Sequence, residues 1–167
     1  EQQDLLKIIM GITSNGLSVK QNTNLAINIY ENYLRTGQIF GEGSGTSKQA
    51  MQNSFDLLNA LIQSNGLENT ISFMKRNIPV KDLDAVMSFA TRSKKSVGLE
   101  SKNAIVKGSS MFGPKIGGGF IPNLLGDYTA LTPDRWFMRT WGRTTGTLLS
   151  ANQKALNSSS SKFRSTI

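Results

Sequence analysis

The chain has 167 residues, a length that suits one domain with a hydrophobic core or two small lobes that share a cleft. It contains no cysteine and no histidine, which excludes disulfides, cysteine-ligated metals and every catalytic arrangement that needs a histidine. No apolar run approaches the roughly 20 residues that span a membrane, so we expect no membrane partner. Any chemistry has to come from Lys, Asp, Glu, Tyr or backbone amides, and we expect no cofactor.

Charge is distributed unevenly along the chain. Residues 1–91 contain seven Lys or Arg and eight Asp or Glu, a net charge of −1, whereas residues 92–167 contain twelve and three, a net charge of +9. A basic half on a neutral chain is typical of a protein that binds a polyanion such as DNA. A solvated basic surface without a ligand would have the same composition, so both interpretations stay open.

Apolar residues at helical spacing predict an all-α fold. In chain order, the expected helices cover residues 4–13, 18–37 with Ser18 as the N-cap, 46–66, 68–75 and 79–90. The polar and basic residues 91–102 predict a loop, 103–107 a short helix and 147–156 a last helix.

We expect two helical lobes. Lobe A covers about 36–102, lobe B covers about 1–35 plus 103–156, and the serine-rich residues 157–167 form a flexible tail. The chain begins with Glu1 instead of Met, which suggests a fragment of a longer precursor.

A tight corner at residues 111–115, Met-Phe-Gly-Pro-Lys, precedes an apolar helical segment at 116–125. A tight corner between two helices exposes the backbone amides that begin the second helix, and such amides suit a phosphate. Gly113 would let the backbone approach that phosphate closely, and Lys115 would lie beside the same ligand.

A second helix is expected to begin at Thr132, with Pro133 at its first position and Asp134 in its first turn. Three cations then follow at spacings of four residues and share one helical face, namely Arg135, Arg139 and Arg143. One cationic face at the end of an apolar hairpin is typical of a phosphate-binding surface.

Lys115 and Asp134 are the candidate catalytic pair. An amine and a carboxylate at one cleft suit attack on C1′ of a deoxynucleotide, because the carboxylate stabilises an oxocarbenium ion and a desolvated amine can form a Schiff base. Alternatively, Lys115 contacts a phosphate and Asp134 only stabilises the start of its helix.

This segment resembles the helix-hairpin-helix DNA glycosylases of the endonuclease III superfamily. Residues 109–117, SSMFGPKIG, are similar to the family's hairpin L-P-G-V-G-x-K-T-A, and residues 133–143, PDRWFMRTWGR, are similar to V-D-T-H-x-x-R-x-x-x-R. Residues 12–22 show a weaker similarity to an N-terminal segment of the family. Met111 replaces the first glycine of the hairpin, and the cysteines of an iron–sulfur cluster are missing.

The resemblance implies a base-excision N-glycosylase, with or without AP-lyase activity, that binds double-stranded DNA and extrudes one nucleotide. It implies that Lys115 and Asp134 are catalytic and that Gly113 approaches the DNA backbone. The remaining nucleic-acid contacts would be Arg135, Arg139 and Arg143 for phosphates and Trp136 or Trp141 for stacking on a base.

Two other classes of function fit the sequence. The chain could be a non-catalytic helical DNA-binding module, or a nuclease or interaction domain masked by an acidic immunity protein. The fragment-like start and basic end also fit the toxin domain of a secreted antibacterial effector, which would act on the nucleoid in the cytoplasm of a target cell.

Overall fold

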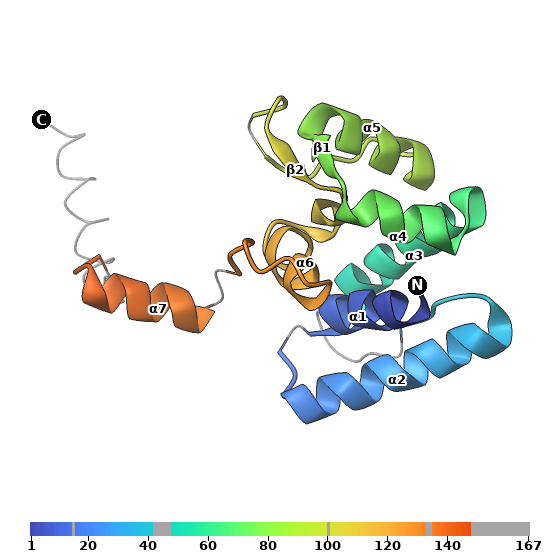
Figure 1. The fold of residues 1–167 in the computed structure, drawn as a ribbon, viewed down its shortest axis with the longest axis horizontal. Helices are drawn as coiled ribbons and strands as arrows, with labels where there is room; N and C mark the ends of the chain where they lie inside the picture. Colours follow the sequence, from blue (N-terminus) through green and yellow to red (C-terminus); the bar gives the residue numbers. More distant parts are fainter. Residues whose placement is uncertain (15, 42–47, 100, 133–134, 148–167) are drawn as a thin grey trace, which may run out of the picture. The chain divides into compact units, whose positions relative to one another are not determined.

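A computed structural model describes residues 1–14, 16–41, 48–99, 101–132 and 135–147 of the chain. The structure divides into two units, Glu1–Thr132 and Pro133–Ile167, which are considered separately (Figure 1). Among the described residues almost all regular structure is helical, as the sequence predicts. No helix in the described ranges is long and apolar enough to cross a membrane.

The first two helices, α1 (Gln2–Thr13) and α2 (Val19–Thr36), pack against each other. Ser18 caps α2 as predicted, and it forms a capping box with Gln21. Gly37 ends α2 in the left-handed conformation that favours glycine. A buried bond joins the two helices, since the Thr13 hydroxyl donates to Oδ1 of Asn22 at 2.6 Å.

Three further helices follow as predicted, with ends shifted by one or two residues: α3 (Lys48–Asn65), α4 (Leu67–Lys75) and α5 (Val80–Thr91). α3 contacts both α4 and α5, and in Figure 1 α5 lies at the end of this unit opposite α2. The first two residues of the helix predicted at 46–66 lie outside the described residues.

The predicted helix at 103–107 is wrong. Ile105–Lys107 forms strand β2, which pairs antiparallel with strand β1 (Asn77–Pro79). The adjacent β-branched residues Ile105 and Val106 favour an extended backbone, and five residues are too few for a stable helix without tertiary support. The amide of Gly108 donates to the Arg76 carbonyl at 2.9 Å and so continues the pairing beyond β2.

The corner at 111–115 and the residues on both sides of it form a hairpin of short helical elements. η1 (Gly108–Phe112) is a 3₁₀ helix, and η2 (Ile116–Phe120) is a π-helix that continues directly into α6 (Ile121–Leu124). We call η1, η2, α6 and the turn between them the hairpin. Three glycines in η2 lower its α-helical propensity, which explains why the single predicted helix is replaced by a π-helix and one α-turn.

One hydrophobic core fills the first unit. Side chains from both predicted lobes contribute to it, including Ile8 and Ile29, then Phe55 and Leu83, and finally Ile121 of α6. No separate core marks a boundary between lobe A and lobe B, and their division stays a prediction.

The second unit contains α7 (Arg135–Thr144). The described part of this helix begins three residues after Thr132, the predicted N-cap, while Pro133 and Asp134 lie outside the described residues. The predicted helix at 147–156 and the tail at 157–167 lie almost wholly outside them as well.

Candidate nucleic-acid interface

The hairpin is held together by contacts that only glycines permit. The backbones of Ser109 and Gly117 lie so close that a Cβ atom at Gly117 would collide with the Ser109 carbonyl. The Ser109 hydroxyl, fully buried, donates to the Gly117 carbonyl at 2.6 Å. The glycine run therefore serves close packing of η1 on η2 rather than flexibility.

Backbone amides in the turn are partly used by the turn itself. The amides of Gly117 and Gly118 donate to the Gly113 carbonyl at 2.8 and 3.1 Å. Gly113 has a φ of 93°, a conformation that L-amino acids with a side chain rarely adopt, and a Cβ atom there would meet nothing. Gly113 is therefore needed for the course of the turn, and two amides predicted to face a phosphate already have an acceptor.

Lys115 is the exposed cation of this turn. Met111 of η1 is buried in the core. The structure thus separates the two residues by role: Met111 anchors the hairpin from inside, and Lys115 presents an ammonium group to solvent. A solvated ammonium suits contact with a phosphate.

The segment after α6 returns to the hairpin. The side-chain amide of Asn123 donates to the carbonyls of Asp127 and Ala130 at 2.9 and 2.8 Å, and the Thr132 hydroxyl donates to Oδ1 of Asn123 at 2.8 Å. The backbone at 131–132 passes directly against Gly119, where a Cβ atom would have no room. Thr132 is thereby fixed beside η2.

The return segment contains an ion pair that the sequence does not predict. Lys107 Nζ lies 2.9 Å from a carboxylate oxygen of Asp127, beside a pocket of about 370 Å³. The Thr129 hydroxyl and the Lys107 ammonium together lower the pKa of Asp127 from 3.8 to about 2, with the hydroxyl as the larger cause. Asp127 is the one acidic residue of 92–167 that the structure describes, and it uses the charge of Lys107.

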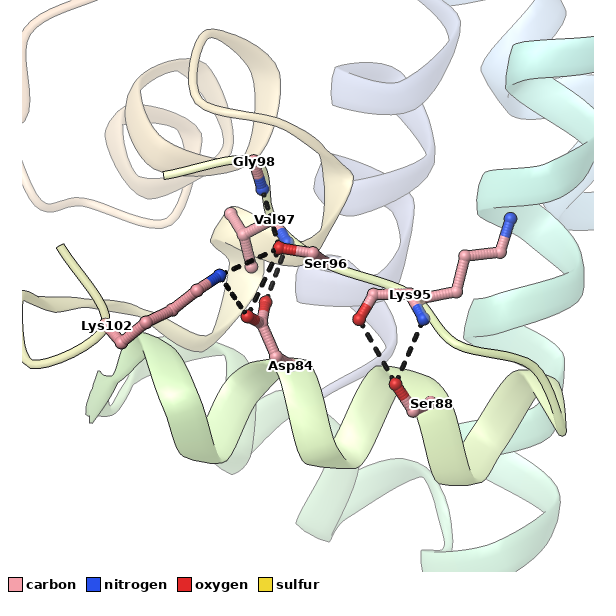
Figure 2. Close-up of polar contacts among 7 residues, drawn as sticks. All are labelled: Asp84, Ser88, Lys95, Ser96, Val97, Gly98 and Lys102. Atoms are coloured by element: carbon pink, nitrogen blue, oxygen red, sulfur yellow. Dashed lines mark hydrogen bonds and ion pairs between the residues drawn. The ribbon is translucent and has the colours of Figure 1, made fainter. Parts of the chain in front are cut away.

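The basic loop after α5 is fixed along that helix. Figure 2 shows Ser88 in contact with Lys95, whose amide donates to the serine hydroxyl at 3.0 Å. It also shows Asp84 accepting from the Val97 amide at 2.8 Å and from the Lys102 ammonium at 2.8 Å. The bond from Lys102, followed by the bond from the Val97 amide, lowers the pKa of Asp84.

α7 carries cations and aromatic rings on different sides. Arg139 and Arg143 are exposed, and the rings of Phe137 and Trp141 stack with their centroids 6.3 Å apart. Trp141 is 58% exposed. Arg139 and Arg143 lie four residues apart on this helix, and Phe137 and Trp141 form an aromatic pair at the same spacing. Contact of the arginines with phosphates stays a prediction.

Three candidate residues fall outside what the structure describes, namely Asp134 and the side chains of Arg135 and Trp136. No group of three or more acidic, His or Cys side chains in the described ranges is arranged to bind a metal.

Comparison with protein-family models, with curated proteins and with solved structures gives no match to this chain. The proposed resemblance to DNA glycosylases therefore has no support from these comparisons, and a function has to be inferred from the residues of the chain.

Proposed function

We propose that the chain binds the phosphate backbone of double-stranded DNA, with Lys115 at the hairpin turn and the arginines of α7 as cationic contacts. One observation carries this proposal: Lys115 is exposed on a turn that is fixed from behind by the buried bond between Ser109 and Gly117. A turn whose backbone is already fixed loses little backbone conformational freedom when its lysine meets a phosphate.

The charge pattern favours a backbone contact over the reading of bases. The net charge of +9 on residues 92–167 is contributed by scattered Lys and Arg, and such charges bind phosphates without regard to sequence. We expect weak dependence on sequence and strong dependence on salt.

A second candidate function is base-excision N-glycosylase activity, in the helix-hairpin-helix manner that the sequence resemblance implies. Thr132 is fixed against Gly119 of η2, and Asp134 follows two residues later in the sequence. In this candidate the Asp134 carboxylate stabilises positive charge on the sugar. The Lys115 amine attacks C1′, and the base departs with the electrons of the glycosidic bond and accepts a proton.

The two candidates are separated by one set of measurements on the full chain. Duplex DNA that contains uracil, alkylated bases or abasic sites is incubated with protein and borohydride, and affinity is measured in parallel. For a binding module, Lys115→Gln lowers duplex affinity several-fold and no adduct forms with any substrate. For a glycosylase with lyase activity, a covalent adduct forms with the wild-type protein and is lost in Lys115→Gln.

The matched control is Lys20→Gln, which removes an exposed lysine from the first turn of α2. It should leave both affinity and adduct formation unchanged. If Lys20→Gln and Lys115→Gln weaken binding equally, the contact is nonspecific attraction to overall charge, and the hairpin has no special role. A toxin role, action on the nucleoid and an acidic immunity partner stay predictions on this basis.

A further inference from the structure

Two hollows of similar composition border α3, and the one between α3 and the end of α5 is called the groove. The first, about 520 Å³, lies at the end of α5 and is lined by Phe89 and Arg92 together with Gln63 and Ser64 of α3. Phe89 is 82% exposed, whereas phenylalanine side chains are usually buried.

The second hollow, about 290 Å³, is formed by other residues of α3 and α5 and by residues of α4. It is lined by Phe73 and Arg76 together with Asn65 and Asn69. The Arg76 guanidinium lies over the Phe73 ring, 5.9 Å from its centroid. Each hollow thus combines one aromatic ring, one arginine and amide or hydroxyl groups.

Positive charge continues from the first hollow into the loop after α5. Arg92, Lys94 and Lys95 are exposed there, and the bonds between Ser88 and Lys95 hold the loop against α5 (Figure 2). Arg92 has a φ of 50°, an uncommon conformation that brings the chain sharply out of the helix. The described residues that line both hollows include no acidic side chain.

We propose that this groove binds single-stranded nucleic acid, with a base stacked on Phe89 and the adjacent phosphates at Arg92 and the basic loop. Exposed aromatic rings beside a cationic track are the usual means of holding unpaired bases, because every base has a face that can stack. Asn and Gln amides in the hollows supply donors and acceptors for base edges.

Two other occupants fit less well. Paired bases in a duplex are already stacked, so a duplex leaves the Phe89 ring without a partner. An acidic peptide would pair with the cations but has no flat group to cover the ring. The site goes beyond the proposed duplex contact, which uses the hairpin and α7, so the two proposals can fail independently.

The test measures fluorescence anisotropy of the full chain with a labelled 20-nucleotide oligodeoxythymidine and with a 20-base-pair duplex. Phe89→Ala should weaken binding of the single strand by roughly 5- to 150-fold, the equivalent of about 1–3 kcal/mol for one stacked base. Binding of the duplex should stay within about twofold. Val19→Ala is the matched control, because Val19 is 84% exposed on α2, and it should change neither affinity.

A charge test uses Arg92→Glu with Lys20→Glu as its control, both at exposed positions. Arg92→Glu should lower single-strand affinity and flatten the dependence of log K on log salt by about 0.7 or more. Lys20→Glu should leave that dependence unchanged.

Four outcomes overturn the proposal. The first is that the wild-type chain does not bind the single strand. The second is that Phe89→Ala binds the single strand as tightly as the wild type does. The third is that Phe89→Ala weakens binding of the single strand and of the duplex equally. In the fourth, polyglutamate displaces the oligonucleotide at equal charge concentration, which identifies an acidic protein as the partner. Loss of duplex binding in Lys115→Gln with intact single-strand binding supports this site and the duplex proposal separately.

Discussion

The hairpin and the groove between α3 and α5 differ in what the sequence reveals of them. The hairpin is conspicuous in the sequence because of Gly117, Gly118 and Gly119, yet two of these glycines allow backbones to touch. Only Pro114 and Lys115 of the hairpin are exposed. The groove has no motif, yet it combines Phe89, 82% exposed, with a fixed basic loop. Glycine spacing indicates close packing, whereas binding capacity depends on which side chains remain accessible.

The comparison predicts opposite consequences for substitutions in the two regions. Changes in the hairpin should act first on the free energy of unfolding, and changes in the groove should act on binding with little effect on stability. Lys115 is the exception, since it belongs to the hairpin but is exposed.

The largest expected effect is that of Gly117→Ala. A Cβ atom at this position collides with the Ser109 backbone, and backbone on both sides has to move, so the unfolding free energy should fall by about 3 kcal/mol. Thermal and denaturant unfolding measure this loss.

Gly118→Ala is the matched control. Its Cβ atom would lie 3.4 Å from the Ser110 hydroxyl, an ordinary contact, and alanine favours a helical backbone. Its stability should be unchanged or higher by up to about 1 kcal/mol. Equal destabilisation by both changes would contradict the packing role of Gly117.

The next effect concerns α7. The double change Arg139→Glu and Arg143→Glu should weaken duplex binding by about 2 kcal/mol, because two phosphate contacts are replaced by repulsion. The double change Lys20→Glu and Lys48→Glu, at exposed positions on α2 and α3, is the control for total charge. Affinity equal to that of the control variant would remove α7 from the proposed interface.

A smaller effect is expected at Asp84, which ties the loop at 95–98 to α5. Asp84→Ala removes the acceptor of the Val97 amide and the partner of Lys102, and should cost about 1 kcal/mol of stability. Amide hydrogen exchange should then accelerate in the loop, with α1 and α2 unaffected. Unchanged protection at Val97 would show that another contact fixes the loop.

The smallest effect is a pH dependence from Asp127. Its pKa in the folded chain is about 2, below the 3.8 of an unperturbed carboxyl, so its contribution to stability is present above about pH 4 and is lost as the pH falls through 2. Asp127→Asn should reduce the drop in melting temperature between pH 5 and pH 2. An identical drop in both proteins would mean that the bonds of Asp127 with Thr129 and Lys107 contribute nothing to stability.

Much of the helical framework could be predicted from the sequence, because apolar spacing and caps act locally. The capping box of Ser18 and the left-handed Gly37 are cases in which one residue type fits one backbone conformation. Strand β2 could not be predicted, because three residues become a strand only through pairing with β1, which lies 28 residues earlier in register at Ile78 and Val106.

The candidate site was predictable only in part. Exposure of Lys115 follows from its place after Gly113 and Pro114 in a turn. The internal use of the Gly117 and Gly118 amides depends on the exact geometry of a π-helix, and residue spacing does not carry that geometry. The two hollows combine residues from three consecutive helices, at scattered positions between 60 and 92, so no local pattern marks them.

The central claim is tested most directly by the salt dependence of duplex DNA binding for the wild-type chain and for Lys115→Gln. If Lys115 contacts a phosphate, log K falls steeply with log salt in the wild-type chain, and the slope becomes shallower by about 0.9 in the variant. Identical slopes and affinities for the two proteins, or an absence of duplex binding at low salt, would contradict the account.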